Sequence, residues 1–160
     1  MLCKLKFFFI KNKLKRYISE AQNPRVDKSK FLSSKETQDK LDVLKLKEKT
    51  FSSTLLDFID KKEITDVECY KSANIDRKLF SKIRSNDDYK PSKNTVFAFA
   101  IALRLDLQET DVLLASAGYS LSHSFLTDII VEFFIKHKKY DINQINFALE
   151  DYKQSPLGSF

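Results

Sequence analysis

Residues 64–94 read ITDVECYKSANIDRKLFSKIRSNDDYKPSKN, and this stretch predicts two short helices joined by a tight turn. Thr65 is the expected N-cap of the first helix, because its hydroxyl can accept the backbone N–H of Glu68 while the Glu68 carboxylate reaches back in a capping box. Asp76 is the expected N-cap of the second helix. Between the two, Asn74 tolerates the left-handed conformation that a sharp reversal requires.

The second predicted helix, residues 76–85, separates apolar from cationic residues. Leu79, Phe80 and Ile83 fall on one side, which we expect to point inward. The other side carries Arg77, Lys78, Ser81, Lys82 and Ser85. Arginine and lysine can bond guanine edges or neutralise phosphate, and serine can bond either. This side suits a DNA major groove, and the alternative interpretation is a solvated basic helix.

Over residues 51–105 the chain resembles the Cro and phage-repressor (XRE) type of helix-turn-helix. The likeness rests on a threonine-initiated helix, a turn, an isoleucine-polar-cationic helix and a helix led by Pro91. It implies a bacterial or phage-type DNA-binding regulator in which the loop after the second helix contacts phosphate. The expected DNA-binding residues are therefore Arg77, Lys78, Ser81, Lys82, Arg84, Tyr89, Lys90 and Lys93.

A second and closer resemblance covers about residues 50–160. The segments NIDRKLFSKIRSN, KPSKNT and AGYSLSHS resemble the all-helical C-terminal domain that follows a macrodomain in bacterial ADP-ribose-processing proteins. The macrodomain itself needs glycine-rich loops for close approach to phosphates, whereas this chain has two glycines, Gly118 and Gly158. No ADP-ribose chemistry is implied, and we expect no cofactor.

Two residues depart from the repressor pattern. Asp66 stands where the family commonly has a glutamine that contacts DNA, and an anion there would be repelled by phosphate. Tyr70 stands where a small residue usually packs between the two helices. These departures favour an alternative hypothesis, a protein-interaction or inhibitor module that kept the helix-turn-helix fold without DNA binding.

Composition predicts an all-α fold, a compact bundle of about seven helices with a basic N-terminal extension. The chain of 160 residues is 42% hydrophobic and has only two glycines and three prolines, too few breakers for a β-rich design. Residues 1–48 contain 13 Lys and Arg against 6 Asp and Glu, while residues 49–160 contain 15 against 16. We therefore expect a basic extension and linker over 1–48 and a near-neutral helical domain over 49–160.

Further helices are expected over residues 51–62, 92–103, 106–117, 123–138 and 141–153. Ser92 and Asp106 are the expected N-caps of two of them, and Gly118 is the expected helix end. The last two helices carry more apolar residues than a five-helix repressor head needs. This excess closes a larger core or, as the alternative, forms a homodimer interface.

The basic and aromatic residues 1–20 predict an amphipathic helix. Three interpretations stay open: a phosphate-gripping arm, an interfacial membrane helix, or a helix packed on its own domain. Residues 21–38 are expected to be a linker, and residues 35–49 a charged helix. The apolar run 7–10 is too short for a secretory signal, and no stretch is long enough to span a bilayer. The expected location is the cytoplasm.

No residue pattern indicates catalysis or a metal site. Cys3 and Cys69 have neither metal-ligand spacing nor a disulfide framework, so both are expected to be free thiols. His123 is expected at a helix start and His137 near a helix C-terminus, where the helix dipole favours it. We therefore expect a protein that is not an enzyme, with double-stranded DNA or a protein as its partner.

Overall fold

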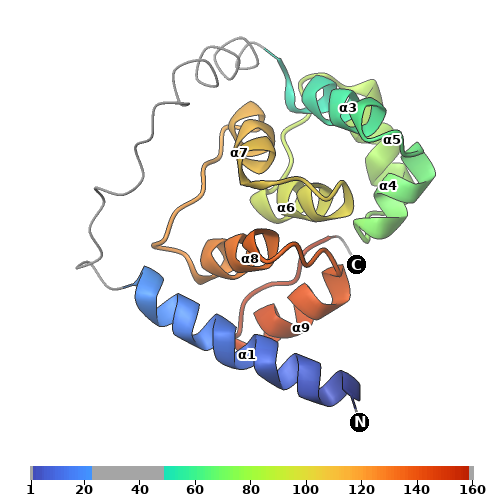
Figure 1. Ribbon diagram of the computed structural model, residues 1–160. Helices are drawn as coiled ribbons and strands as arrows, with labels where there is room; N and C mark the ends of the chain where they lie inside the picture. Colours follow the sequence, from blue (N-terminus) through green and yellow to red (C-terminus); the bar gives the residue numbers. More distant parts are fainter. Residues whose placement is uncertain (1, 23–48, 159–160) are drawn as a thin grey trace.

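The computed structural model describes residues 2–22 and 49–158, with side chains from Phe9 onward in the first segment. Within these residues the chain forms eight helices and no strand, which confirms the expected all-α bundle (Figure 1). Seven of the helices lie in residues 49–158, and the eighth lies in the N-terminal segment. The expected linker from residue 23 and the charged helix before residue 49 lie outside the described residues.

Helix α6 (Lys93–Ala102) lies at the centre of one group of helices. The helices around it are α3 (Phe51–Lys61), α4 (Asp66–Ser72), α5 (Arg77–Ser85) and α7 (Leu107–Ser116). Every residue of α6 from Thr95 to Ile101 is buried, because the run is apolar on all sides and contacts α4, α7 and α9. A helix without a polar face is stable in water only when neighbours cover it completely. The central position of α6 therefore follows from its sequence.

The last two helices close the other side of the core, beneath α6. They are α8 (Leu126–Lys136) and α9 (Ile142–Asp151). All residues of α8 from Asp128 to Ile135 are buried. The apolar excess of this region is therefore used mainly within the chain.

The start of α8 corrects one predicted boundary. A helix was expected from His123, but α8 begins at Leu126 with Phe125 at the N-cap position. The Asp128 carboxylate accepts the backbone N–H of Ser122 at 2.8 Å, which turns the chain back just before the helix. The apolar periodicity alone did not reveal this boundary, because the start of the helix depends on a hydrogen bond between residues six positions apart.

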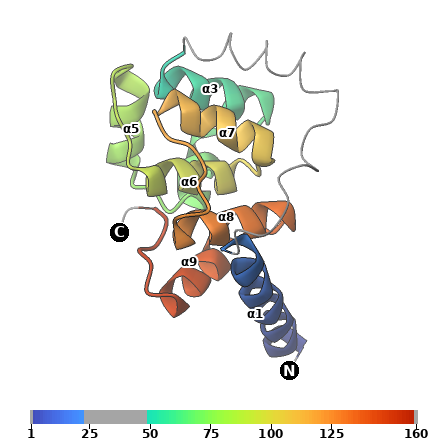
Figure 2. The same ribbon diagram turned by 90° about the vertical axis from the view of Figure 1, so that its left-hand side faces the viewer.

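Helix α1 (Leu2–Ala21) confirms the predicted N-terminal helix and packs on the body of the protein (Figure 2). Leu14 is 1% exposed, Ile18 is 7% exposed, and both belong to the main hydrophobic core. The centre of the Tyr17 ring lies 5.5 Å from the centre of the Phe133 ring in α8. Burial of one apolar stripe thus fixes α1 against α8, which agrees with the interpretation of a helix packed on its own domain. In the described part of the chain, none of the helices is both long and apolar enough to cross a bilayer.

Candidate nucleic-acid interface

The α4–α5 pair forms through the local signals expected from the sequence. The Thr65 side chain accepts the N–H of Glu68, and the Glu68 carboxylate accepts the N–H of Thr65 at 2.9 Å, which completes the capping box. The hydrogen bonds that the Glu68 carboxylate accepts, first from the Thr65 backbone N–H and then from the Thr65 hydroxyl, lower the pKa of Glu68. Asp76 caps α5 by accepting the N–H of Lys78 at 3.1 Å. Asn74 has φ +51°, the left-handed conformation predicted for the turn.

The back of this turn is covered by the C-terminal segment, which the sequence did not predict. Leu157 is fully buried, and Asn146 of α9 holds its backbone through two hydrogen bonds of 2.7 and 3.1 Å. Gly158 follows with φ +88°, and a Cβ at this position would lie 2.8 Å from the carbonyl oxygens of Ala73 and Asn74. Residues 157 and 158 therefore lie beside the end of α4 and support the turn that orients α5 (Figure 1).

Gly158→Ala is expected to destabilise the protein by about 1–3 kcal/mol, because the left-handed backbone strains an L side chain and the added methyl meets two backbone oxygens. Urea denaturation followed by circular dichroism measures this change. Gly118→Ala is the matched control, since Gly118 has φ +80° but nothing within 4 Å of an added Cβ. An equal loss in both variants would show that backbone strain alone acts and that contact with the turn contributes nothing.

The inner side of α5 is anchored as predicted. Phe80 is 4% exposed and Ile83 is 1% exposed, while Leu79 is half-buried against the core. The centre of the Phe80 ring lies 5.6 Å from the centre of the Tyr70 ring and 6.1 Å from that of the Phe99 ring. Tyr70 therefore fills the space between α4 and α5 and joins them to the core. These contacts fix the rotation of α5 about its own axis.

The α5 outer face consists of Arg77, Lys78, Ser81, Lys82 and Ser85, all of which are exposed. Within the described residues, no carboxylate pairs with Arg77, Lys78 or Lys82. The Lys82 ammonium lies 5.6 Å from the centre of the Tyr89 ring, a cation–π contact that directs it along the surface. Helix α5 lies at an outer edge of the bundle (Figure 2), and the side chains of its outer face are exposed.

Asp66 and Arg84 form an ion pair between α4 and α5. Asp66, the anion that was expected to repel phosphate, is therefore neutralised by Arg84, a cation that was expected to bind DNA. The Arg84 side chain remains 55% exposed. A guanidinium carries five N–H donors, so Arg84 can still donate to a second acceptor.

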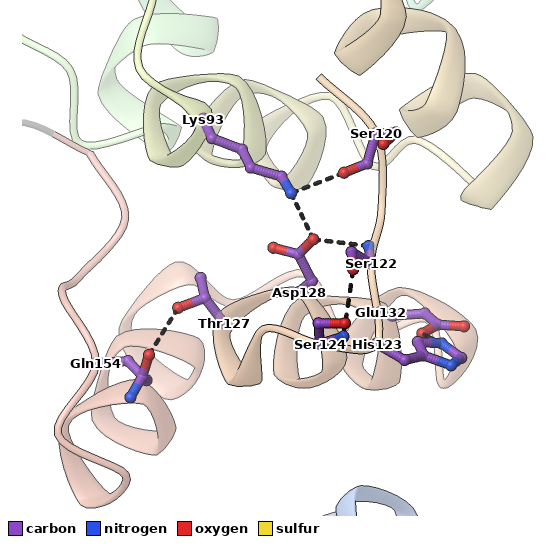
Figure 3. A network of polar contacts seen from close by, with 9 residues as sticks. All are labelled: Lys93, Ser120, Ser122, His123, Ser124, Thr127, Asp128, Glu132 and Gln154. Carbon is purple, nitrogen blue, oxygen red and sulfur yellow. Dashed lines mark hydrogen bonds and ion pairs between the residues drawn. The ribbon is translucent and has the colours of Figure 1, made fainter. Parts of the chain in front are cut away.

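Lys93, one of the predicted DNA-binding residues, is directed into the molecule. Its ammonium donates to the Asp128 carboxylate at 2.5 Å and to the Ser120 carbonyl at 2.7 Å (Figure 3). Its side chain is 23% exposed, and that of Asp128 is 3% exposed. The same Asp128 oxygen accepts the N–H of Ser122. Lys93 therefore ties the start of α6 to the start of α8.

The loop between α5 and α6 is held at both ends. Ser52 of α3 donates its hydroxyl to the Asn86 carbonyl at 3.0 Å, and the Tyr119 hydroxyl donates to the Pro91 carbonyl at 3.0 Å. Between these anchors Tyr89 is half-buried and Lys90 is exposed. The exposed carboxylates Asp87 and Asp88 share this loop with Lys90, so the surface formed by the α5 outer face and Lys90 has an acidic border.

Both histidines have structural contacts. His123 Nε2 lies 2.6 Å from the Glu132 carboxylate, which also accepts from the Lys136 ammonium at 2.7 Å. Burial raises the pKa of Glu132, but the hydrogen bonds and charges of Lys136 and His123 outweigh burial and the pKa is lowered overall. His137 lies at the C-cap of α8, as expected, with Nδ1 2.8 Å from the Phe133 carbonyl oxygen.

Potential metal ligands do not gather in the described part of the chain. It contains no group of three or more His, Cys, Asp or Glu side chains that could hold a metal ion. Cys69 is a fully buried free thiol, and burial raises its pKa to about 12. A thiol in this state is a poor nucleophile at neutral pH.

No protein-family model matches this chain, and neither the curated proteins nor the solved structures include a match to it.

Proposed function

We propose that this protein binds double-stranded DNA by placing α5 in the major groove, as a transcriptional regulator or a phage- or defence-associated factor. The observation that carries the proposal is the α5 outer face. Its cations point to solvent without carboxylate partners among the described residues, while Phe80 and Ile83 anchor the opposite side. A helix held in this way presents its charges in a fixed orientation, which direct reading of base edges requires.

The dimensions and position of α5 suit this role. An α-helix with its side chains is about 10–12 Å across, and the major groove is about 12 Å wide. Arg77 and Lys78 stand at the first two positions of α5. The N-terminal residues of a recognition helix are those that usually meet base edges. The resemblance to the XRE type over residues 51–105 adds support, since it implies that the second helix of the pair reads DNA.

The charge pattern predicts modest affinity with strong salt dependence. Residues 76–93 contain six cations, of which Arg84 and Lys93 pair with Asp66 and Asp128. This leaves four cations without a carboxylate partner among the described residues, Arg77, Lys78, Lys82 and Lys90, for neutralising phosphates. For about four neutralised phosphates, the logarithm of the binding constant is expected to fall with the logarithm of salt concentration with a slope of about −4.

Fluorescence anisotropy with a labelled random duplex, titrated from low to physiological salt, tests the proposal. Saturable binding with the slope given above supports it, and sequencing the DNA that co-purifies with the protein would identify the target. Absence of binding to any duplex at low salt would refute it. That result would favour the protein-interaction module, for which the Asp66–Arg84 pair and the acidic border of the loop are the supporting observations.

A further inference from the structure

Helix α1 has a solvent-exposed side that combines cations with an aromatic ring. Phe9 is 64% exposed although the opposite side of the helix is buried through Leu14 and Ile18. Exposed cations lie on both sides of Phe9 around the helix axis. We call this surface the α1 outer face, and its described members are Phe9, Lys11, Asn12, Lys13, Lys15 and Arg16.

Part of the positive charge of the α1 outer face has no carboxylate partner among the described residues. Lys11 pairs with Asp151 of α9 at 2.8 Å, and Arg16 pairs with Glu20 at 2.8 Å. Neither Lys13 nor Lys15 has a carboxylate partner in the described part of the chain. The sequence of α1 holds six Lys and Arg against one Glu. The surface is therefore complementary to an anionic partner.

The geometry points to the surface of an anionic lipid bilayer as the partner of the α1 outer face, and we propose that α1 lies in the plane of that interface. At 100° per residue, Phe9, Asn12 and Arg16 share the side facing away from Leu14, with Lys13 and Lys15 on its two borders. An exposed aromatic ring with lysines on both borders of its face is typical of an interfacial helix.

A lipid surface explains the aromatic ring, whereas the phosphate backbone of a nucleic-acid duplex does not. The phosphates of a duplex would be neutralised by the lysines and would leave Phe9 in water. In a bilayer interface the ring enters the acyl boundary while the flexible lysine stems extend their ammonium groups to the lipid phosphates. The Phe9 exposure therefore distinguishes the two partners.

The position of α1 agrees with this arrangement. Helix α1 is about 30 Å long and lies along the outside of the bundle, and both views place it far from α5 (Figures 1 and 2). With the α1 outer face on a membrane, the α5 outer face would still be accessible to the aqueous phase. The inference is therefore independent of the proposed DNA binding.

A tryptophan reporter tests the proposal directly, because the natural chain has no tryptophan. In Phe9→Trp, the emission maximum is expected to shift to the blue with vesicles of phosphatidylcholine and phosphatidylglycerol, and not with pure phosphatidylcholine. Phe125→Trp is the matched control, because Phe125 is also exposed, at 62%, but lies beside Lys93 at the start of α8. This control is expected to show no shift.

Charge removal provides the second arm. Lys13→Gln/Lys15→Gln is expected to lower the partition of the protein onto anionic vesicles about 25-fold, since each lysine near such a surface contributes about fivefold. Arg77→Gln/Lys82→Gln removes the same charge from α5 and is expected to leave vesicle partition nearly unchanged. All four positions are exposed, and thermal denaturation verifies that both variants fold.

Three results would overturn the proposal. The first is no binding to anionic vesicles at low salt. The second is an equal loss in the two double variants, which would indicate general attraction of a basic protein. The third is a shift of Phe9→Trp emission by duplex DNA and not by vesicles, which would assign the α1 outer face to nucleic acid.

Discussion

Lys93→Met is expected to lower the free energy of unfolding by about 3 kcal/mol. The substitution leaves the Asp128 carboxylate, 3% exposed, without the ammonium that lies 2.5 Å from it. Removing one partner of a buried ion pair costs about 3–5 kcal/mol, because the remaining charge stays desolvated. We expect the lower end of this free-energy range, since the Ser122 N–H still donates to Asp128 and Lys93 itself is partly exposed. Urea denaturation at neutral pH measures the change.

Two controls separate this loss from a simple change of surface charge. Lys90→Met removes an exposed cation from the adjacent loop and is expected to alter stability by no more than about 0.5 kcal/mol. Lys93→Met/Asp128→Leu removes both charges and is expected to recover most of the stability, because an apolar pair leaves no buried charge. If Lys93→Met were as stable as Lys90→Met, the interaction with Asp128 would contribute nothing to the fold.

Arg77→Glu/Lys82→Glu is expected to weaken DNA binding by roughly 100-fold or more at low salt. Both side chains belong to the α5 outer face and have no carboxylate partner among the described residues. Each lost contact costs about 1–3 kcal/mol, and the new carboxylates add repulsion from phosphate. The salt dependence is expected to become shallower by about two in slope, since two phosphate contacts are lost.

The matched control for this variant lies on α1. Lys13→Glu/Lys15→Glu changes the net charge by the same amount at two exposed positions and is expected to keep DNA affinity close to that of the natural protein. Equal weakening in both variants would contradict the major-groove role of α5 and indicate attraction through overall charge. If neither variant changed DNA affinity, α5 would not be the binding element.

The local structure of the candidate site could be predicted from the sequence. The caps at Thr65, Asp76 and Asp106 and the left-handed residue Asn74 all have the predicted conformations. Each depends on atoms no more than four residues apart, so a short stretch of chain contains both partners. The all-helical fold and the inward side of α5 followed from composition and the helical repeat for the same reason.

The state of individual side chains was decided by the tertiary structure. Lys93 was predicted at the DNA backbone from its place in the loop, but its carboxylate partner lies 35 residues further along the chain. Gly158 likewise contacts a turn more than 80 residues earlier. The sequence by itself determined which helices form and which side of each is apolar, because these properties repeat within one or two turns. Only the packing of the helices decided which cations face solvent, because an ion pair between distant residues needs their backbones to be brought together first.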